Sequence, residues 1–370
     1  MAYRVIQWAT GGVGRAAIEG VLDHPELELV GCWVHGAAKE GKDVGELVGR
    51  APIGVRTTRD VDALLALPAD CVVYSPLMAD PKMLVRILRS GKNVVTPLGW
   101  IYPKRQDNRE IEAACREGRS TLHGTGIHPG GITERFPLMV SSLSRAITHV
   151  RAEEFSDIRT YSAPQVVREI MLFGKEPAVA KKSPMLKFLG GGFMQSIDMV
   201  ADTLGFALDP EKRAIHEIAV ATAPIDSPIG TIAPGLVAAQ RFAWQGLVRG
   251  EPVVTAAVNW FMGDRHLAPL PDGDPSLPWS FGPEGERFEV EITGDPKTHL
   301  TFHGWHPESI AAGLARNEGI VATAMHCVSS IPYVCAAEPG IKTYLDLPLI
   351  AGRAAPHLAR SSSPSGGERR

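Results

Sequence analysis

The chain has 370 residues, of which 44% are hydrophobic and 21% charged, and its formal net charge is −3. These values are ordinary for a globular protein, so they exclude a disordered or fibrous chain, and the length favours two domains. With so little net charge there is no global field to attract nucleic acid or an anionic membrane, and we expect neither as a partner.

The N-terminal part of the chain alternates between strand-like and helix-like segments. Short apolar runs predict strands over residues 4–8, 27–34, 71–74, 93–96 and 120–123. Apolar residues at helical spacing predict helices between them, over residues 12–22, 60–67, 81–90 and 110–117. Such alternation is typical of a parallel, doubly wound sheet. We therefore predict an α/β fold whose Rossmann domain covers residues 1–135.

The pattern changes after Gly131. Residues 150–155, 253–261 and 287–292 alternate in the manner of half-buried strands and are separated by long loops. They predict an α+β substrate domain over residues 136–307, with a mixed or antiparallel sheet. A mobile segment that contains the glycines 190–192 is expected before a helix over residues 194–204.

The C-terminal part returns to helix. Residues 309–336 predict a long helix, and residues 345–350 predict a last strand or a bracing segment. We expect residues 308–350 to pack against the Rossmann domain again. The tail, residues 361–370, is rich in Ser, Gly and Pro and is predicted to be disordered.

The cysteines, the N-terminal residues and one long uncharged stretch indicate in which compartment of the cell the protein is expected. Five cysteines without a CxxC pair favour reduced core thiols over a disulfide framework. The chain begins with a strand-like run, so no secretory signal is expected. The uncharged stretch 319–337 contains His326 and Pro332, which favours a buried helix over a membrane span. We therefore expect a soluble, cytoplasmic protein.

The strongest motif lies between the first predicted strand and the first predicted helix. Residues 8–15 are Trp-Ala-Thr-Gly-Gly-Val-Gly-Arg, an AxGxxG form of the dinucleotide fingerprint. Gly11 would let the backbone approach a pyrophosphate, and Gly14 would let helix and strand pack closely. A glycine-rich turn without a ligand is the alternative. The strand–turn–helix context favours a nicotinamide dinucleotide site, formed by Ala9, Thr10, Gly11, Gly12, Val13, Gly14 and Arg15.

The end of the second predicted strand bears on which dinucleotide binds. The sequence Val34-His35-Gly36 lacks the Asp or Glu that would hold the ribose 2′-hydroxyl of NAD. His35, Lys39 and Lys42 could instead donate hydrogen bonds to a 2′-phosphate, unless they form a solvated loop. We therefore expect NADP(H) to be preferred, with NAD(H) as the alternative.

Several segments together resemble a known family. They are the fingerprint, Gly91-Lys92-Asn93-Val94-Val95-Thr96, Gly124-Thr125-Gly126-Ile127-His128-Pro129-Gly130, and the C-terminal Pro339-Gly340-Ile341 and Asp346-Leu347-Pro348. The chain resembles the dihydrodipicolinate reductase-like superfamily, and within it the 2,4-diaminopentanoate dehydrogenases and the amine dehydrogenase-like proteins common in actinobacteria. The resemblance implies a Rossmann domain, a mixed α/β substrate domain that also forms a homodimer, and hydride transfer at a C=N bond.

One stretch departs from the family pattern. The amine dehydrogenases carry a Glu-Glu pair after the Val-Val-Thr strand, followed by Tyr-Pro, and a glutamate there serves the amine. Residues 96–103 here are Thr-Pro-Leu-Gly-Trp-Ile-Tyr-Pro, without an acid. Because a cationic substrate beside Leu98 and Trp100 would lack a counter-ion and a proton acceptor, we expect reductive amination to be slow or absent. The HHxxK pattern of dihydrodipicolinate reductase is absent as well.

Polar groups at the carboxyl ends of the predicted strands are candidates for the nicotinamide end of the site. Ser75, Pro76 and Thr96 are expected beside the cofactor. Tyr102 and His128, on the loops that follow, are candidate catalytic residues, and the near-neutral pKa of His128 suits a proton donor. The alternatives are a packed aromatic ring for Tyr102 and a backbone-bonded loop histidine for His128.

A segment of the substrate domain places ionisable groups at the end of a strand. Period-two alternation puts Glu154 and Ser156 on one face and Asp157 and Tyr161 on the other. We expect Glu154, Asp157 and Tyr161 to be candidates for substrate binding, with a solvated strand end as the alternative.

Two further groups of residues have structural alternatives. His299, His303 and His306 form a late cluster, but no carboxylate or cysteine lies at matching spacing, so we expect no metal site. A set of apolar residues predicts either a substrate pocket or plain core: Met171, Phe173, Phe188, Phe193 and Met194.

Together these features predict an enzyme, an NAD(P)-dependent dehydrogenase or reductase. We expect it to transfer hydride to or from a C=O, C=N or activated C=C group of a small, partly apolar organic substrate. The alternative is a catalytically silent NAD(P)-binding sensor or structural relative of the family.

Overall fold

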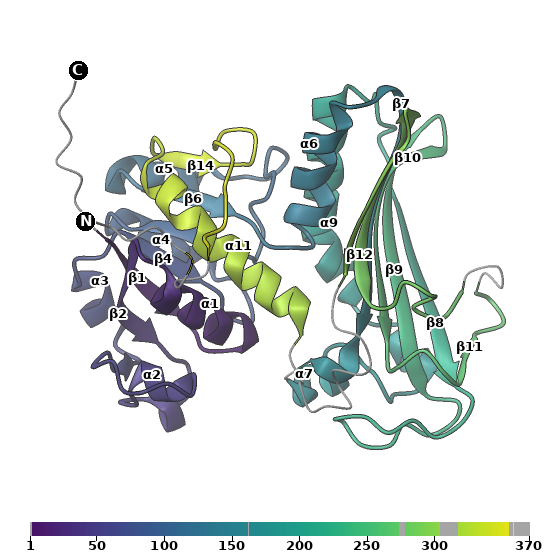
Figure 1. Ribbon diagram of the computed structural model, residues 1–370, viewed down its shortest axis with the longest axis horizontal. Helices are drawn as coiled ribbons and strands as arrows, with labels where there is room; N and C mark the ends of the chain where they lie inside the picture. The colour runs from purple at the N-terminus through teal and green to yellow at the C-terminus, as the bar shows by residue number, and fades with distance from the viewer. Residues whose placement is uncertain (1, 162, 274–277, 304–316, 355–357, 359–370) are drawn as a thin grey trace.

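The computed structural model describes residues 2–161, 163–273, 278–303, 317–354 and 358. Two seven-stranded sheets form two lobes, and helices α6 (Phe136–Ser141) and α9 (Met185–Leu204) stand between them (Figure 1). The first sheet belongs to the N-terminal part of the chain, and the second is formed by residues 145–303.

The first sheet is parallel, with strand order β14-β6-β5-β4-β1-β2-β3. Its strands are β1 (Tyr3–Trp8), β2 (Leu27–Trp33), β3 (Thr57–Thr58), β4 (Cys71–Tyr74), β5 (Asn93–Thr96), β6 (Thr121–Gly124) and β14 (Gly340–Lys342). The five strands predicted in this part of the chain lie within one residue of the observed ones. The α/β Rossmann fold is confirmed.

Helices cover both faces of the parallel sheet. Helices α1 (Gly12–Asp23) and α11 (Glu318–Cys335) pack on one face, and α3 (Val61–Ala66), α4 (Pro81–Arg89) and α5 (Arg109–Gly118) pack on the other. The neighbouring residues Val5 and Ile6 of β1 enter opposite cores, because successive strand side chains point to opposite faces. A 3₁₀ turn (Ala37–Lys39) and α2 (Val44–Leu47) lie between β2 and β3.

The second sheet is mixed, with strand order β11-β8-β9-β10-β7-β12-β13. Its strands are β7 (Arg145–Asp157), β8 (Arg213–Ala221), β9 (Val237–Val248), β10 (Glu251–Phe261), β11 (Leu267–Pro269), β12 (Arg287–Asp295) and β13 (Thr298–His303). β10 and β7 run parallel, and the other neighbours run antiparallel. Sequence analysis missed β9, because its first eight residues are buried on both faces and show no polar alternation.

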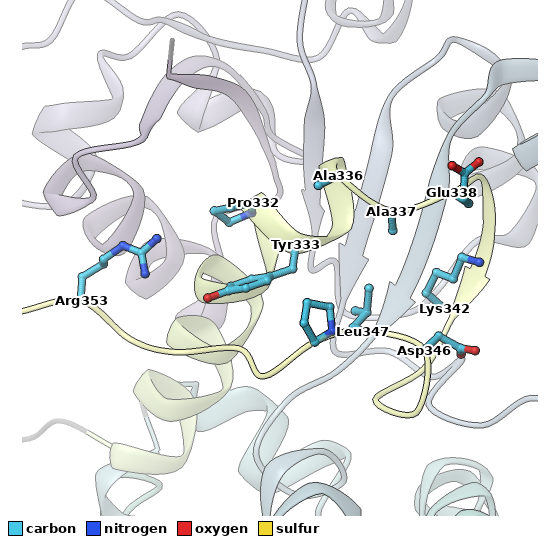
Figure 2. Close-up of a pocket in the computed structure, with 10 residues that line it drawn as sticks. Pro332, Tyr333, Ala336, Ala337, Glu338, Lys342, Asp346, Leu347 and Arg353 are labelled. Atoms are coloured by element: carbon cyan, nitrogen blue, oxygen red, sulfur yellow. The ribbon is translucent and has the colours of Figure 1, made fainter. Parts of the chain in front are cut away.

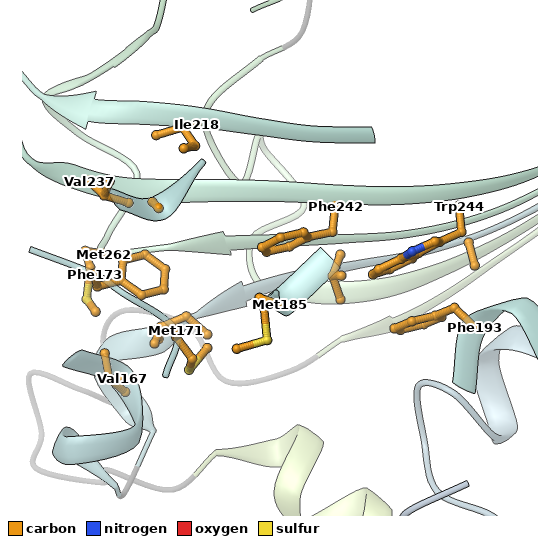
Figure 3. Close-up of a cluster of buried hydrophobic side chains, with 14 of the residues drawn as sticks. Val167, Met171, Phe173, Met185, Phe193, Ile218, Val237, Phe242, Trp244 and Met262 are labelled. Carbon is orange, nitrogen blue, oxygen red and sulfur yellow. The ribbon is translucent and has the colours of Figure 1, made fainter. Parts of the chain in front are cut away.

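A hydrophobic core fills the space between the second sheet and its helices (Figure 3). The shorter helices of this lobe are α7 (Pro164–Glu169) and α8 (Pro177–Ala180). Met171, Phe173 and Phe193, which were considered for an apolar pocket, belong to this core together with Trp244. Phe188 is exposed instead. The apolar residues of this segment therefore serve mainly in packing.

The three glycines near residue 190 lie inside a helix and not in a mobile segment. Helix α9 begins at Met185, about nine residues earlier than predicted, and includes Gly190 to Gly192. A Cβ at Gly190 would lie 2.9 Å from the indole nitrogen of Trp244, and one at Gly192 would lie 2.8 Å from Pro129. Close packing therefore explains glycines in a helix, where their propensity alone is unfavourable.

The C-terminal segment returns to the first sheet. Helix α11 packs against α1 and β5, and β14 pairs with β6. Of the two alternatives for residues 345–350, the strand is wrong: the strand lies at Gly340–Lys342, and the later residues form turns and irregular chain. The bracing segment agrees with the structure, because Leu347 and Ile350 are buried in the core beneath α1 and α11. The start of the predicted helix, residues 309–316, and the tail from residue 361 lie outside the described residues.

All five cysteines are free thiols, four of them buried, as expected for a core role. None of the helices in the described ranges has the length and apolar character that crossing a bilayer requires.

Candidate functional site

The turn between β1 and α1 is built by close backbone contacts. Ala9 has a positive φ of 76°, at the position where the fingerprint usually has glycine. A Cβ at Gly14 would lie 2.2 Å from the carbonyl oxygen of Ala9, so only glycine fits there. At Gly11, by contrast, a Cβ would meet no atom within 4 Å. Gly14 is thus required by packing, whereas Gly11 leaves open space above the turn.

Helix α1 begins at this turn with free backbone donors. No side chain caps its first amides, and its first turn contains no acidic residue. The exposed amide groups and the positive end of the helix dipole therefore point into the open space at Gly11, an arrangement suited to an anion.

Gln7 holds the turn against the neighbouring strand. Its side-chain amide donates to the carbonyl oxygen of Ala9 at 2.8 Å and to the hydroxyl of Ser75 at 2.9 Å. Ser75 follows β4, so this buried amide fixes the ends of two adjacent strands relative to each other. Sequence analysis did not identify Gln7, because nothing in a strand sequence marks which side chain turns towards the next loop.

A groove of about 510 Å³ runs from this turn towards the second lobe. Its walls contain nine of the predicted cofactor residues: Ala9, Thr10, Gly11, Gly12, Val13, His35, Lys39, Ser75 and Pro76. Tyr161 of the predicted substrate set lines the same groove. The volume lies within the usual range of small-molecule sites.

The basic end of the groove is formed by the loop after β2. The ammonium group of Lys39 lies 3.1 Å from both the carbonyl oxygen and the hydroxyl of Thr10, and His35 lies beside the ring of Trp33. Lys42 does not line the groove. None of the residues that the structure describes in the groove walls is Asp or Glu.

Three predicted cofactor residues do not line the groove. Gly14 is buried under the turn, and Arg15 is exposed on α1. Thr96 is fully buried, and its hydroxyl accepts a hydrogen bond from the amide of Leu98 at 3.2 Å. Its place at the end of β5 is as predicted, but the loop folds over it and brings Pro97 and Leu98 to the groove instead.

Tyr102 lies away from the groove, against α9. Its hydroxyl donates to Asp202 at 2.9 Å, and its backbone amide donates to Gln195 at 3.0 Å. The structure therefore places it as a packed aromatic residue that joins the two lobes. A catalytic role for Tyr102 finds no support in this geometry.

His128 also lies outside the groove walls. One ring nitrogen, Nε2, lies 2.9 Å from the carbonyl oxygen of Ala257, and the ring packs against Phe193 and Phe288. Burial lowers the pKa of His128 to about 4, so the ring is neutral near pH 7 and its Nε2–H donates to Ala257. A protonated imidazole, as expected from the sequence, does not fit this environment. Whether the neutral ring acts in catalysis stays a prediction.

Glu154 of β7 is a half-buried residue whose carboxyl group is close to Tyr161. Its Oε1 accepts hydrogen bonds from the Ser156 hydroxyl at 2.8 Å and from the Trp260 indole at 3.0 Å. Burial raises the pKa of Glu154 to about 7. Burial and the nearby Glu154 carboxyl both raise the pKa of Tyr161, so its hydroxyl keeps its proton at neutral pH.

Asp157 is engaged within its own segment. Its carboxylate accepts hydrogen bonds from the backbone amide and the guanidinium of Arg159, and it is 1% exposed. The expected alternation of side chains fails here, because β7 ends at Asp157 and a 3₁₀ turn (Ile158–Thr160) follows. The structure therefore brings Tyr161 to the groove and leaves Asp157 out of it.

Several groove residues were missed by sequence analysis. They are Gly36, Ala38, Leu77, Pro97, Ala163, Val166 and Ile320. Leu98, expected beside a substrate, does line the groove, whereas Trp100, expected with it, does not. Leu77 could have been found from its place after the Ser75-Pro76 strand end. Ile320 comes from α11, far along the chain, and no local signal marks it.

The two described members of the predicted histidine cluster do not line the groove. His299 and His303 are placed near Glu289 and Glu284, both at 3.8 Å, and His306 lies outside the described residues. Within the described ranges no three or more His, Cys, Asp or Glu side chains are grouped so that they could hold a metal ion.

A hollow of about 440 Å³ lies at the other end of α11, beside β14 (Figure 2). Two of its four charged residues are already engaged: Asp346 accepts hydrogen bonds from Thr343, and Arg353 pairs with Glu26. The hollow lacks a glycine turn and open helix amides, so we do not take it as the candidate site.

The chain is similar to known proteins in sequence. Residues 5–116 match a family model described as dihydrodipicolinate reductase, N-terminus. An amine dehydrogenase of Streptomyces virginiae is 33% identical over 366 residues, which cover 93% of this chain and 96% of that protein. A 2,4-diaminopentanoate dehydrogenase of Acetoanaerobium sticklandii is 24% identical over 67% of this chain and 64% of its own length.

The chain is similar to a solved structure as well. An amine dehydrogenase from Mycobacterium smegmatis superposes with a TM-score of 0.73 at 21% identity, over 95% of this chain and 98% of that one. This likeness concerns the fold.

Proposed function

The chain belongs to the dihydrodipicolinate reductase-like superfamily, together with its relative, the amine dehydrogenase of Streptomyces virginiae. Because of this membership, we propose that the chain is a nicotinamide-dependent oxidoreductase. The observation that carries the proposal is the groove itself. It joins the glycine turn and the free amides of α1 to side chains of the second lobe, so a dinucleotide lying on the turn would reach a space between the lobes.

The residues present fit a dinucleotide. The open space at Gly11 accepts a pyrophosphate without a clash, and the uncapped first turn of α1 supplies its donors. Lys39 offers a positive charge, and Lys39 and His35 both offer hydrogen-bond donors, where the ribose of the adenosine would lie. We therefore propose NADP(H) as the preferred cofactor.

The substrate end of the groove combines apolar walls with one polar group. Leu98, Val166 and Ile320 are apolar, and Tyr161 supplies a hydroxyl. A reduced nicotinamide supplies hydride to the electrophilic carbon of the substrate. We propose that the Tyr161 hydroxyl donates the accompanying proton to the substrate oxygen or nitrogen, because it lines the groove and holds its proton at neutral pH.

Glu154 and His128 would support proton transfer by Tyr161. Glu154 lies close enough to raise the pKa of Tyr161 and can return a proton to it, since its own pKa is raised to about 7 by burial. His128 remains a second candidate for proton transfer. We propose that both support the substrate end and that neither binds the cofactor.

We propose a neutral C=O, C=N or activated C=C group as the substrate class. Residues 96–103 bring no carboxylate to the groove, so a cationic substrate would be desolvated without a counter-ion on that side. Reductive amination is therefore expected to be slower than reduction of a neutral substrate. A cytoplasmic location and a homodimer stay predictions.

A substrate panel tests the function directly. Purified protein is mixed with NADPH or NADH and with ketones, preformed neutral imines or enones, and ketones are also tested with added ammonia. Loss of reduced-nicotinamide absorbance with a neutral substrate is the expected result. Rapid turnover only with ammonia would contradict the substrate class, and dinucleotide binding without any turnover would instead favour a catalytically silent sensor.

A further inference from the structure

A second groove, of about 580 Å³, lies between the loop after β5 and the flank of α9. It shares no lining residue with the groove over the β1–α1 turn. One wall comes from the first lobe, through Arg105, and the opposite wall comes from α9 and the edge of the second sheet. The proposed oxidoreductase reaction does not use this groove.

The floor of the second groove is apolar and rigid. It consists of Leu186 and Met194, and Trp244, which also lines the groove, is itself fully buried. The Trp244 ring is stacked on Phe193 with ring centroids 4.4 Å apart, and its indole N–H donates to the Leu186 carbonyl at 3.3 Å. At Gly191 a Cβ would meet nothing within 4 Å, so the backbone there faces open space in the groove.

The charged rim carries an excess of positive charge. Arg105, Lys187 and Lys212 line the groove, and Asp198 is the single acidic residue among the lining residues that the structure describes. One Asp198 oxygen lies 2.8 Å from the Lys212 ammonium and 3.2 Å from the Arg105 guanidinium. Two cations thus share one carboxylate, and Lys187 adds a third positive charge.

The Lys212–Asp198 pair is part of the wall and not of the open surface. The side chains of Lys212 and Asp198 are 12% and 8% exposed. A cation held at such low exposure is poorly hydrated, so an incoming anion would replace little water and gain a charge-assisted contact.

From the apolar floor and the cationic rim, we propose that the second groove binds a small organic anion, with a carboxylate or phosphate group at the rim and an apolar body on Leu186 and Met194. Arg105 belongs to one lobe, and Lys187 and Lys212 belong to the other. A bound anion therefore spans both lobes and stabilises their arrangement.

Binding is measured by calorimetry with 4-phenylbutyrate and phenyl phosphate as anionic probes and with 4-phenylbutan-1-ol as the neutral match of the first. Saturating NADPH is present, so the dinucleotide groove does not compete. We expect at least one anionic probe to bind about tenfold more tightly than the alcohol, a difference equal to about 1.4 kcal/mol. Which probe binds more tightly distinguishes a carboxylate from a phosphate ligand.

Two variants locate the binding. Gly191→Leu fills open space with a better helix former, and we expect it to lose probe binding while its thermal unfolding stays cooperative. Lys187→Gln should weaken binding about fivefold and reduce its salt dependence, whereas Lys182→Gln, the same charge change at an exposed lysine outside the groove, should not.

Equal affinity of the acids and the alcohol would overturn the proposal, as would unchanged binding to Gly191→Leu. The comparison of the acids with the alcohol and the binding measurement on Gly191→Leu are both independent of turnover. A failure here therefore leaves the proposed oxidoreductase function untouched, and a failure of the substrate panel leaves this groove untouched.

Discussion

The ammonium group of Lys39 lies 3.1 Å from both the carbonyl oxygen and the hydroxyl of Thr10, although 29 residues separate the two in sequence. This contact places a cation beside the turn on which the pyrophosphate is proposed to rest. Because the groove walls that the structure describes include no carboxylate, that charge is available to a phosphate.

Replacing Lys39 should therefore change the choice of cofactor. Lys39→Met is expected to weaken NADPH binding by about 10–100-fold, the usual effect of losing a hydrogen bond to a charged group, and to change NADH binding much less. Fluorescence titration with both dinucleotides at one salt concentration measures the ratio. Lys42→Met, at a lysine outside the groove, is the matched control, and equal losses for NADPH and NADH in Lys39→Met would exclude contact with a 2′-phosphate.

His35→Asp should move the preference in the other direction. An acid at the end of β2 can accept hydrogen bonds from the ribose hydroxyls of NADH and repels a 2′-phosphate. We expect tighter binding of NADH and weaker binding of NADPH in the same titration. A variant that still prefers NADPH would show that His35 does not face the ribose.

The two glycines of the turn should separate binding from folding. Gly11→Val places a side chain in open space, so the protein should fold with a nearly unchanged melting temperature but bind no dinucleotide. Gly14→Ala would force a methyl group against the Ala9 carbonyl, so it should lower the melting temperature as well. If Gly11→Val bound NADPH like the native protein, the dinucleotide site would have to lie elsewhere.

The proton donor can be identified by comparing variants of Tyr161, Tyr102 and His128. Tyr161→Phe should lower kcat by about 10²–10⁴-fold with the best substrate of the panel, without changing NADPH affinity. Tyr102→Phe should have little effect on kcat, because its hydroxyl is bonded to Asp202 away from the groove. His128→Gln tests the second candidate, and a loss confined to that variant would transfer the role of proton donor from Tyr161 to His128.

Glu134 should make the folded state sensitive to alkaline pH. This carboxyl group is fully buried in the π-helical turn Gly131–Arg135, where it accepts hydrogen bonds from the Gly130 amide and the Ser196 hydroxyl. Burial raises its pKa to about 8 from an ordinary value of 4.5. The folded state therefore holds this proton more tightly than the unfolded state does.

The stabilisation from Glu134 is complete below about pH 4.5 and is lost as the pH rises through 8. Glu134→Gln keeps the neutral shape, and its amide can donate to Ser196 while its oxygen accepts from Gly130. The free energy of unfolding of this variant should exceed that of the native protein at pH 9 by a few kcal/mol, with a smaller difference at pH 5. Denaturant titration at both pH values measures it, and parallel pH profiles would rule out a buried neutral Glu134.

Five strands of the parallel sheet could be predicted from the sequence because they are short, largely apolar runs and glycine or proline marks several of the boundaries around them. The strands of the second sheet were harder to predict. Strands β8 and β9 were not predicted. β9 is buried along its first eight residues and so shows no period of two, whereas the first five residues of β8 are exposed or half-buried and show no alternation with buried ones. The glycines of α9 were wrongly assigned to a mobile segment for a related reason. Gly190 is required by the indole of Trp244, 54 residues later in the sequence, and Gly192 by Pro129, so no local pattern marks either contact.

In the candidate site, too, residues marked by a local sequence pattern were predicted better than residues brought in from distant parts of the chain. The turn residues were predicted, because a fingerprint is a local pattern read directly along the chain. The residues of the substrate end were predicted less well, because Tyr161 reaches the groove only through the 3₁₀ turn that interrupts alternation, and Ile320 arrives with α11. The sequence context of His128 suited a proton donor. Packing against Phe193 and Phe288 buries the ring and lowers its pKa, and these contacts cannot be predicted from the sequence around His128.

The pairing of β14 with β6 has a consequence for synthesis of the chain. The first lobe is not a continuous piece of sequence, because one of its edge strands and the helix α11 over its face are made last. While a ribosome is still translating the second lobe, the core against α1 stands open to water. A nascent first lobe must therefore wait for residues 318–342 before it can close, and a fragment that stops at residue 135 should be retained by chaperones or aggregate rather than fold.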